Sequence, residues 1–362
     1  MRIVCAMSGG VDSSVAAALL VEAGHEVVGI TMRLYDASAH GEASAGGRCC
    51  SPAEVYRARE VCDLLGIPHY VVDESELFWQ RVIVPFGRDY AAGRTPNPCT
   101  RCNQHVKFPP LVARARALGA ERLATGHYAR KVGNALCRAA DPRKDQSYFL
   151  FSMGRAALSF VEFPLGGMTK DEVRARARAL GLPSADAPDS QELCFVSSDG
   201  HAAFLERHAA RLGVSGEALA EGPVLDRAGR VVGTHGGIHT VTVGQRRGLA
   251  VAGTRRRYVL SIVPEQRAVV VGDAKDLQVA GLEVGEVCDL GLPAEPFSAR
   301  VQVRHRSRPY EAVVVPGGRR ARVRFQEPVS AVAPGQAAVF YVGERVVGGG
   351  WIDRVHPGDA SP

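Results

Sequence analysis

The chain has 362 residues, of which 46% are hydrophobic and 23% are charged. This length allows two or three domains with at least one large core, and the composition excludes a disordered or fibrous protein. No apolar run approaches the roughly 20 residues of a membrane-spanning helix. Met1 leads directly into structured sequence, so we expect no signal peptide and a cytoplasmic protein without a membrane segment.

The net charge and the cysteine count narrow the class of protein further. A formal net charge of +6 favours a polyanionic partner only weakly, because arginine is abundant throughout the chain. Nine cysteines without a secretion signal argue against a disulfide scaffold. In a reducing compartment, clustered cysteines indicate metal or redox chemistry.

The first half of the chain alternates apolar strands with helical patterns. Buried strands are expected at residues 2–6, 26–31, 69–72 and 122–125. Helices are expected at about 12–23, 52–65, 77–90 and 110–118. This alternation implies right-handed crossovers and a doubly wound, Rossmann-like parallel α/β sheet that is covered on both faces.

The second half changes in texture. Residues 169–180 (TKDEVRARARAL) predict a helix, with Thr169 as its N-cap and acids before arginines. From about residue 222, glycine-rich turns and short alternating strands predict an all-β region that ends in a small β-barrel. We therefore expect three domains, a catalytic α/β domain, a small central domain and a C-terminal barrel, at residues 1–205, 206–275 and 276–362.

The stretch SGGVDSS, between the first strand and the first helix, predicts an anion-binding loop. Gly9 and Gly10 permit close backbone approach and positive φ. Backbone N–H groups at a helix start favour phosphate. Three hydroxyls can add donors, those of Ser8, Ser13 and Ser14. Asp12 would repel phosphate, so we expect it to contact magnesium, and the missing GxxxxGK[ST] lysine argues against γ-phosphate transfer.

Cysteines cluster in two further stretches. RTPNPCTRCNQHVKF carries Cys99 and Cys102, and DSQELCFV carries Cys194. A CxxC pair could supply half of a tetrahedral site. Cys49 and Cys50, which are adjacent to each other, could join it to bind zinc or an iron–sulfur cluster. A thioredoxin-like redox pair fits less well, because the surrounding sequence does not follow that motif. Four others are interpreted as small buried apolar residues: Cys5, Cys62, Cys137 and Cys288.

The glycine loop resembles the SGGxDS loop of the N-type ATP pyrophosphatases, or PP-loop superfamily, whose members adenylate an oxygen and release pyrophosphate. Over nearly its whole length the chain resembles the tRNA-specific 2-thiouridylases. Six stretches occur in the order and spacing of that family, namely SGGVDSSVAA, TPNPCTRCNQHVKF, ATGHYAR, KDQSYFL, DSQELCF and VGQRRGL.

This resemblance implies ATP-dependent 2-thiolation of the wobble uridine of tRNA. ATP would adenylate the 2-carbonyl oxygen, and Cys194 would carry a persulfide from a sulfur donor that a cysteine desulfurase supplies. The persulfide sulfur, or hydrosulfide released from it by the nucleophile Cys102, would then attack the activated carbon. Cys102 and Cys194 would end as a disulfide. Cys99 occupies a position where relatives often carry aspartate. A cluster stays possible, but we favour the persulfide route because no motif supplies a fourth ligand.

The resemblance also assigns binding residues. ATP, with magnesium, would contact Ala6, Met7, Ser8, Gly9, Gly10, Val11, Asp12, Ser13, Met32 and Gly126. The tRNA would contact Asn97, Pro98, Cys99, His127, Lys144, Asp145, Gln146, Arg304, His305 and Gln336, the first three around a flipped base. Without the resemblance, we interpret Met32 as core, His127 as a structural histidine and residues 144–146 as a solvated, exposed loop.

The C-terminal strands carry a series of arginines that alternation would gather on one sheet face. They are Arg300, Arg304, Arg306, Arg308, Arg319, Arg320, Arg322 and Arg324. Such a stripe suits a phosphate backbone, although an arginine-rich composition on a solvated face explains it equally well. Two departures from the family, Ala187 and residues 254–257, do not touch the expected chemistry.

Two rival functions differ in their use of cysteine and ATP. Another adenylating enzyme of the superfamily would need no paired cysteines. A tRNA-binding or sulfur-carrier protein would release no AMP and pyrophosphate. We expect a thiolating enzyme that acts as a monomer.

Overall fold

The computed structural model describes residues 1–35, 52–187, 193–251 and 256–358. Contacts divide the chain into two compact units. The first unit contains residues 1–82, 99–198 and 344–346. The second contains residues 83–98, 199–343 and 347–362. The three consecutive domains expected from the sequence stay a prediction.

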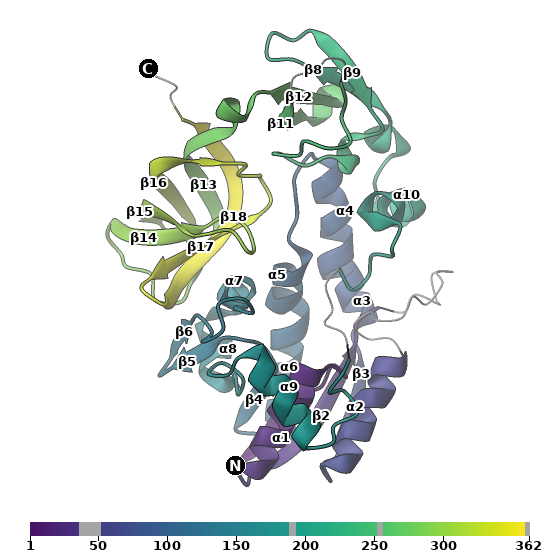
Figure 1. Cartoon of the computed structure of the whole chain (residues 1–362), viewed down its shortest axis with the longest axis vertical. Helices are drawn as coiled ribbons and strands as arrows, with labels where there is room; N and C mark the ends of the chain where they lie inside the picture. The colour runs from purple at the N-terminus through teal and green to yellow at the C-terminus, as the bar shows by residue number, and fades with distance from the viewer. Residues whose placement is uncertain (36–51, 188–192, 252–255, 359–362) are drawn as a thin grey trace. The chain divides into compact units, whose positions relative to one another are not determined.

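A five-stranded sheet forms the centre of the first unit (Figure 1). Its order is β3 (His69–Asp73), β2 (Glu26–Arg33), β1 (Arg2–Ala6), β4 (Arg122–Thr125) and β7 (Val161–Glu162). All four neighbouring pairs are parallel. The strand order reverses at β1, so the expected doubly wound sheet is confirmed. In such sheets ligands bind at the carboxyl ends of the strands, where the order reverses.

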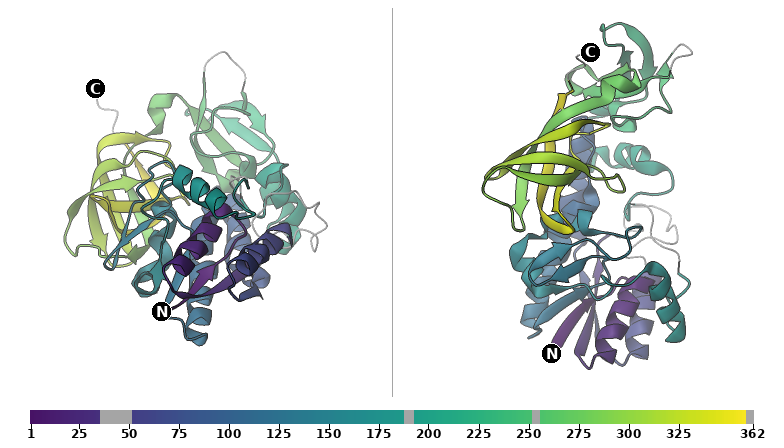
Figure 2. Two further views of the ribbon diagram at one scale, coloured as in Figure 1. Left: turned by 60° about the horizontal axis from the view of Figure 1, so that its bottom comes forward. Right: turned by 60° about the vertical axis from the view of Figure 1, so that its left-hand side comes forward.

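Helices cover this sheet, which Figure 2 shows from two further sides. Residues of α1 (Val11–Glu22), α2 (Pro52–Leu64) and α9 (Lys170–Ala179) share one hydrophobic core with Ile3 and Cys5 of β1. Side chains alternate along a strand, so the buried Val4 between them points to the opposite face. A further helix of this unit, α6 (Phe108–Ala117), contacts β1 and β4.

Two helical runs contain π turns that periodicity did not predict. The run expected at 77–90 is α3 (Ser75–Phe78), a π turn at Trp79–Ile83 and α4 (Val84–Ala91). The run expected from 110 begins earlier, with α5 (Pro98–Cys102), a π turn at Asn103–Lys107 and then α6. Each π turn ends two residues before a proline, Pro85 or Pro109. Proline lacks the N–H of a regular helix bond, and the widened turn accommodates that loss.

The remaining elements of the first unit are short. They are β5 (Arg130–Val132), β6 (Ala135–Cys137), α7 (Ser147–Leu150), a 3₁₀ turn at Phe151–Met153 and α8 (Gly154–Phe160). β5 and β6 form a hairpin, and β6 also pairs with Arg345–Val346.

The second unit carries α4, α10 (Gly200–Leu212) and the all-β part of the chain. One sheet has the order β10 (Ala250–Val251), β9 (Val231–His235), β8 (Gly222–Leu225), β12 (Ala268–Gly272) and β11 (Tyr258–Val263). The buried residues of its core that the structure describes include Val224, Ile238, Val241, Val259, Val269 and Val271. 3₁₀ turns lie at Gly216–Leu219, Ile238–Thr240, Pro264–Gln266 and Ala274–Leu277.

The expected C-terminal β-barrel is confirmed. Its strands are β13 (Gln278–Asp289), β14 (Phe297–Gln302), β15 (Tyr310–Gly317), β16 (Arg320–Ser330), β17 (Ala337–Val342) and β18 (Arg345–Pro357). The pairing runs β13-β16-β15-β14-β17-β18, and β13 also pairs with β18, which closes the barrel. Strictly alternating burial along the first part of β16 points Ala321, Val323 and Phe325 into the barrel core.

None of the helices in the described parts of the chain combines the length and apolar character that crossing a membrane requires.

Candidate active site

The SGGVDSS loop connects β1 to α1 at the point where the strand order reverses. Gly9 has φ +77°, and a Cβ there would lie 2.2 Å from the carbonyl oxygen of Glu54 in α2. Glycine is therefore required at residue 9 by conformation and by space. Gly10, the N-cap of α1, has φ −83°, so the expected positive φ is wrong at this residue. Among the described residues, a Cβ on Gly10 would meet only Ser8 Oγ, at 3.5 Å.

The serine hydroxyls hold the loop in shape. Ser13 Oγ and Ser14 Oγ donate to the Gly10 carbonyl at 3.0 and 2.9 Å. Ser13 Oγ also accepts from the Ser8 N–H and lies 3.1 Å from Ser8 Oγ. The protons of Ser13 and Ser14, expected to face an anion, are thus used within the loop. In the described part of the chain no side chain caps α1, which leaves first-turn N–H groups for an anion.

Two other elements approach the loop closely. A Cβ on Gly126, directly after β4, would lie 2.7 Å from both Asp12 C and Ser13 N. Only glycine allows this contact between the end of β4 and the start of α1. Arg57 of α2 points Nη1 toward the Gly9 carbonyl at 3.4 Å. The residue after β4 and a side chain of α2 therefore both contact the loop.

Asp12 forms an ion pair that the sequence did not predict. Lys170, at the start of α9, places Nζ 2.7 and 2.9 Å from the two carboxylate oxygens. Tyr128 Oη donates to Asp12 Oδ1 at 2.7 Å. Both carboxylate oxygens already have partners, so the expected magnesium contact of Asp12 stays a prediction. Among the described residues no group of three or more His, Cys, Asp or Glu side chains could hold a metal ion.

Hydrogen bonds link the loop to two other predicted stretches, ATGHYAR and KDQ. Gln146 and Tyr128 form a two-way bridge, in which Gln146 N–H donates to Tyr128 O and Tyr128 N–H donates to Gln146 Oε1, both at 2.8 Å. Tyr128 reaches Asp12 through its hydroxyl. Segments more than 100 residues apart therefore form one network at the carboxyl edge of the sheet.

The same network continues to the first cysteine stretch. α7, which follows Gln146 directly, ends beside the turn that carries Cys102. Asn103 Nδ2 donates to the Phe149 carbonyl at 3.0 Å, and Ser152 Oγ donates to the Thr100 carbonyl at 3.3 Å. The residues flanking Cys102 are thus fixed to the segment that begins at KDQ.

His127 is half-buried and lies beside Gly126. Its Nδ1 is 2.9 Å from Thr125 Oγ1, and its ring lies 6.0 Å from that of Phe108. Burial, and secondarily the charge of Lys107, lowers the pKa of His127 to about 3. The imidazole is therefore neutral at physiological pH and can form hydrogen bonds but cannot attract an anion by charge. Its expected tRNA contact stays a prediction.

The exposed KDQ loop expected from the sequence is not exposed. Asp145 has a side chain only 7% accessible and pairs with Arg138 at 2.9 Å. It also accepts from Ala139 N, Ser147 N and Ser147 Oγ. Its carboxylate organises the turn before α7, and Lys144 beside it is half-buried. The tRNA contacts expected of residues 144–146 stay predictions.

The other expected nucleotide-binding residues line the edges of the loop. Ala6 ends β1, and the buried Met7 donates its N–H to Ile30 O at 2.8 Å. Val11 begins α1 and is buried in the core. Met32 lies within β2, which extends to Arg33, and not beyond the strand as expected. Met32 lies near the carboxyl end of β2, and β2 is the neighbour of β1, the strand that the loop follows.

The expected reactive cysteines differ in exposure. Cys102 is buried, with 5% of its surface accessible, whereas Cys99, three residues earlier on α5, is exposed. Residues three apart on a helix are neighbours, so these thiols lie on one side of the turn. Cys194 is half-buried, and the next residue, Phe195, packs edge-on against Tyr35 after β2. All three belong to the first unit. Their roles stay predictions.

The structure describes four of the remaining cysteines. Cys5, Cys62 and Cys137 are buried, as expected, whereas Cys288 is half-buried. Burial raises the pKa of Cys5 and of Cys62 to about 12, so neither forms a thiolate near neutral pH. Cys49 and Cys50, the possible additional metal ligands, lie outside the described residues.

Gln336, an expected tRNA contact, holds a segment of the second unit. Its Nε2 donates to the carbonyls of Thr95 and Pro96 at 3.0 and 3.2 Å. Asn97 and Pro98, which follow, are buried. Gln336 therefore fixes the backbone that leads into α5, and its expected tRNA contact stays a prediction.

The arginine series of the barrel is divided between a loop and a strand. Arg304, His305, Arg306 and Arg308 lie between β14 and β15 and not on a strand, and the three arginines there are exposed. Arg320, Arg322 and Arg324 alternate on the exposed face of β16. Arg300 donates to the Gly343 carbonyl. The single stripe expected from alternation is therefore two separate groups.

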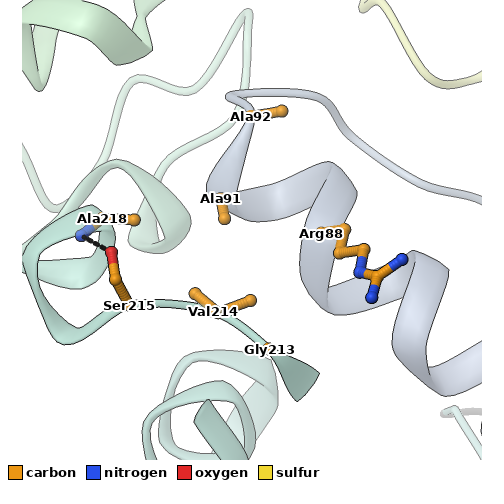
Figure 3. Close-up of a pocket in the computed structure, with 7 residues that line it drawn as sticks. All are labelled: Arg88, Ala91, Ala92, Gly213, Val214, Ser215 and Ala218. Carbon is orange, nitrogen blue, oxygen red and sulfur yellow. Dashed lines mark hydrogen bonds between the residues drawn. The ribbon is translucent and has the colours of Figure 1, made fainter. Parts of the chain in front are cut away.

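A pocket in the second unit includes none of the expected site residues. It has a volume of about 370 Å³ and is lined by Arg88, Ala91, Ala92, Gly213, Val214, Ser215 and Ala218 (Figure 3). Ser215 Oγ accepts from the Ala218 N–H within its wall. Most of the lining residues are alanine, glycine or valine. The candidate site is therefore the SGGVDSS loop at the carboxyl edge of the sheet in the first unit.

Sequence reasoning missed Lys170, Tyr128 and Arg57, the side chains that surround the loop from other elements. Tyr128 stands within ATGHYAR, which marked it indirectly. Lys170 sits in the first turn of a predicted helix, where no pattern distinguishes it from a solvated lysine.

Three family models match the chain. They are described as tRNA methyl transferase HUP domain at residues 1–198, tRNA methyl transferase PRC-barrel domain at 214–273 and aminomethyltransferase beta-barrel domain at 286–352. The solved structures similar to this chain include a 4-thiouridine synthetase–RNA complex with bound ATP, at 18% identity and a TM-score of 0.33. That similarity covers 59% of this chain and 50% of that one.

Curated relatives match almost the whole chain. The tRNA-specific 2-thiouridylase MnmA of Geobacter metallireducens is 48% identical over 97% of this chain and 96% of its own length. The protein of the same name from Thermus thermophilus is 49% identical over 98% of this chain and 95% of its own length. Identity this high across all domains leaves no room for a different assignment of the fold. The chain belongs to the tRNA-specific 2-thiouridylase family.

Proposed function

We propose that this protein catalyses ATP-dependent 2-thiolation of the wobble uridine of tRNA. The observation that carries the proposal is its 48–49% identity to 2-thiouridylases over nearly the full length. Membership in that family makes tRNA the substrate and 2-thiouridylation the reaction. The positions of the reacting groups on this chain are our inference from the motifs and their geometry.

The loop supports the first step, adenylation. The triphosphate of ATP would lie against the N–H groups at the start of α1, with magnesium bound mainly by its phosphates. The uridine 2-carbonyl oxygen attacks the α-phosphorus, the bond to the β-phosphate breaks and pyrophosphate leaves. The carbonyl oxygen is then part of an AMP leaving group, which makes carbon 2 an electrophile.

The cysteines supply the second step. A persulfide on Cys194 provides sulfur at the oxidation level of elemental sulfur. Attack of the Cys102 thiolate on the inner sulfur forms the Cys102–Cys194 disulfide and releases hydrosulfide, which adds to carbon 2 and displaces AMP. The two thiols supply the two electrons that reduce the transferred sulfur. An external thiol reductant then restores both cysteines.

The partners follow from this chemistry. A persulfide donor, itself supplied by a cysteine desulfurase, would dock where it can reach Cys194, which is half-buried. The tRNA would present a flipped uridine near Cys99 and Cys102, because atom 2 of a stacked base is not accessible. We propose a monomer as the acting species.

Reconstitution tests the function directly. Purified protein, MgATP, a small persulfide donor and unmodified tRNA should yield 2-thiouridine at the wobble position by mass spectrometry, with one AMP per thiolated base. C102S and C194S should each reduce the yield by at least about 10³-fold, since nucleophile losses are of this order. An adenylating enzyme of another type would keep its activity in both variants. A carrier protein would release no AMP.

A matched pair of variants tests the role of Cys99. Relatives often carry aspartate here, so C99D should keep most of the thiolation activity, and C99S should do so less completely. Iron and acid-labile sulfide should be absent from anaerobically purified protein. A stoichiometric cluster that C99S removes would overturn the persulfide route.

A further inference from the structure

The lysine that the glycine loop lacks has a counterpart on another helix. Lys170 lies 158 residues from Asp12 in the sequence, and its ammonium contacts both carboxylate oxygens at 2.7 and 2.9 Å. The Lys170 side chain is 7% exposed, whereas that of Asp12 is 34% exposed. A buried ammonium is stable only when it is paired, so this contact is a fixed feature of the fold.

Several contacts fix Lys170 in this position. Thr169 caps α9 through a capping box with Glu172, and the Lys170 N–H donates to Asp141 Oδ2 at 3.2 Å. The ammonium also lies 5.8 Å from the centre of the Tyr128 ring, whose hydroxyl donates to Asp12. Backbone and side chain of Lys170 are thus both positioned before any ligand arrives.

The charge of Asp12 conflicts with the purpose of the loop. Asp12 lies in the first turn of α1, among the N–H groups that would bind a triphosphate. An unpaired carboxylate there would repel that anion and would neutralise the favourable end of the helix dipole. Paired with Lys170, the carboxylate contributes no net charge.

We propose that Lys170 is a positioning residue for adenylation, which holds Asp12 as one half of a neutral ion pair so that the loop can accept the triphosphate. This inference rests on the proposed function for the identity of the ligand. Lys170 of α9 would thus supply a positive charge beside the loop, whereas a P-loop has a lysine within its own sequence.

A double-mutant cycle separates this role from a direct contact with phosphate. K170M removes the ammonium but keeps a long apolar side chain, and D12N removes the carboxylate charge with little change in shape. The measured quantity is the dissociation constant of MgATP without tRNA, by equilibrium dialysis. We expect K170M to raise it roughly ten-fold when Asp12 is present, because one uncompensated charge then faces the anion. In the D12N background, K170M should change it by less than about three-fold.

A second buried lysine of the same unit provides the control. Lys131 Nζ pairs with Glu162 at 2.9 Å, and its side chain is 9% exposed. It also donates to the Ser159 and Val161 carbonyls, so the partners recorded for its ammonium lie outside the SGGVDSS loop. K131M should lower the melting temperature about as much as K170M and leave MgATP binding unchanged. This comparison corrects for loss of binding through general destabilisation.

Each alternative result overturns the proposal. Unchanged MgATP binding in K170M would make the pair a purely structural contact. An equal loss in the wild-type and D12N backgrounds would mean that Lys170 contacts the phosphates itself. If K131M lost as much MgATP affinity as K170M, the weaker binding would be explained by general destabilisation of the fold. The cycle needs no tRNA, so failure of thiolation by the wild-type protein would refute the proposed function and leave these binding results intact.

Discussion

At the scale of single residues, the loop depends on positions where no other residue type fits. Gly9 and Gly126 lie under backbone atoms of α2 and of the loop, at distances that exclude a Cβ. Asp12 and Tyr128 tie the loop to neighbouring segments through charge and hydrogen bonds. These residues fix the backbone before ATP binds, which reduces the ordering cost of binding.

The two loop glycines should respond differently to alanine. Gly9→Ala forces φ +77° on a residue with a Cβ and places that Cβ 2.2 Å from Glu54 O, so it should cost more than about 2 kcal/mol of unfolding free energy. Gly10→Ala, at φ −83°, should cost less than about 1 kcal/mol. Urea denaturation measures both, and equal losses would contradict the geometry described for the loop.

The lowered pKa of the half-buried His127 predicts a pH dependence of stability. The pKa of His127 is about 3 in the folded chain, against an ordinary value of 6.5. Between these values only the unfolded chain binds the proton, so stability falls as the pH drops below 6.5 and is unaffected above it. His127→Asn should reduce the slope of unfolding free energy against pH in this window. An unchanged slope would show that the ring is not shielded from protonation.

At the scale of elements, the π turns before Pro85 and Pro109 shape both helical runs. The second π turn directly follows Cys102, and its first residue, Asn103, is bonded to Phe149. Helical periodicity continues through such turns only approximately, which explains why the sequence pattern placed the start of α6 too late. The expected 169–180 helix, by contrast, was predicted within one residue at each end, because its cap is local.

The cap of α9 also controls the site. Thr169→Ala removes the hydrogen bond that Glu172 N–H makes to Thr169 Oγ1 and should cost about 1 kcal/mol of stability. Because Lys170 is the next residue, the same change should weaken MgATP binding more than K131M does. Thr169→Ser keeps the hydroxyl and serves as the control. If Thr169→Ala and Thr169→Ser bound MgATP equally strongly, the cap of α9 would have no effect on the loop.

At the scale of the whole molecule, the formal net charge is +6, and the barrel exposes two groups of arginines that could contact a polyanion. Arg320, Arg322 and Arg324 alternate on the exposed face of β16, and the loop before β15 exposes three more arginines. Acids partly neutralise this surface, since Arg320 contacts Asp353 and Arg322 lies opposite Glu283 in the ladder. Salt dependence distinguishes a phosphate-binding surface from a solvated one.

Removing two of these charges should lower tRNA affinity in a salt-dependent way. R322Q/R324Q should reduce the slope of log affinity against log salt by about 1.5, if each guanidinium neutralises one phosphate. The exposed Arg59 of α2 provides a control in R59Q, which should leave the slope unchanged. Filter binding at several salt concentrations measures both. If R322Q/R324Q had the same slope as the wild-type protein, these arginines would reflect the arginine-rich composition of the chain and not a phosphate-binding surface.

The sequence by itself determined the elements that arise from local rules. Alternating apolar strands and helices imply the doubly wound sheet, glycine implies the tight loop, and a Thr-x-x-Glu cap marks α9. The cysteine motifs and their order indicated the family. Each of these signals lies within a few residues of the feature that it predicts.

Only the tertiary structure decided which charges and hydrogen bonds meet. Lys170 reaches Asp12 across 158 residues, Gln146 binds Tyr128, and Gln336 holds the backbone before α5. Such pairs have no periodicity, because chain folding and not local propensity brings them together. The physical reason is that a side chain's electrostatic partner is set by distance in space, which a linear pattern does not encode.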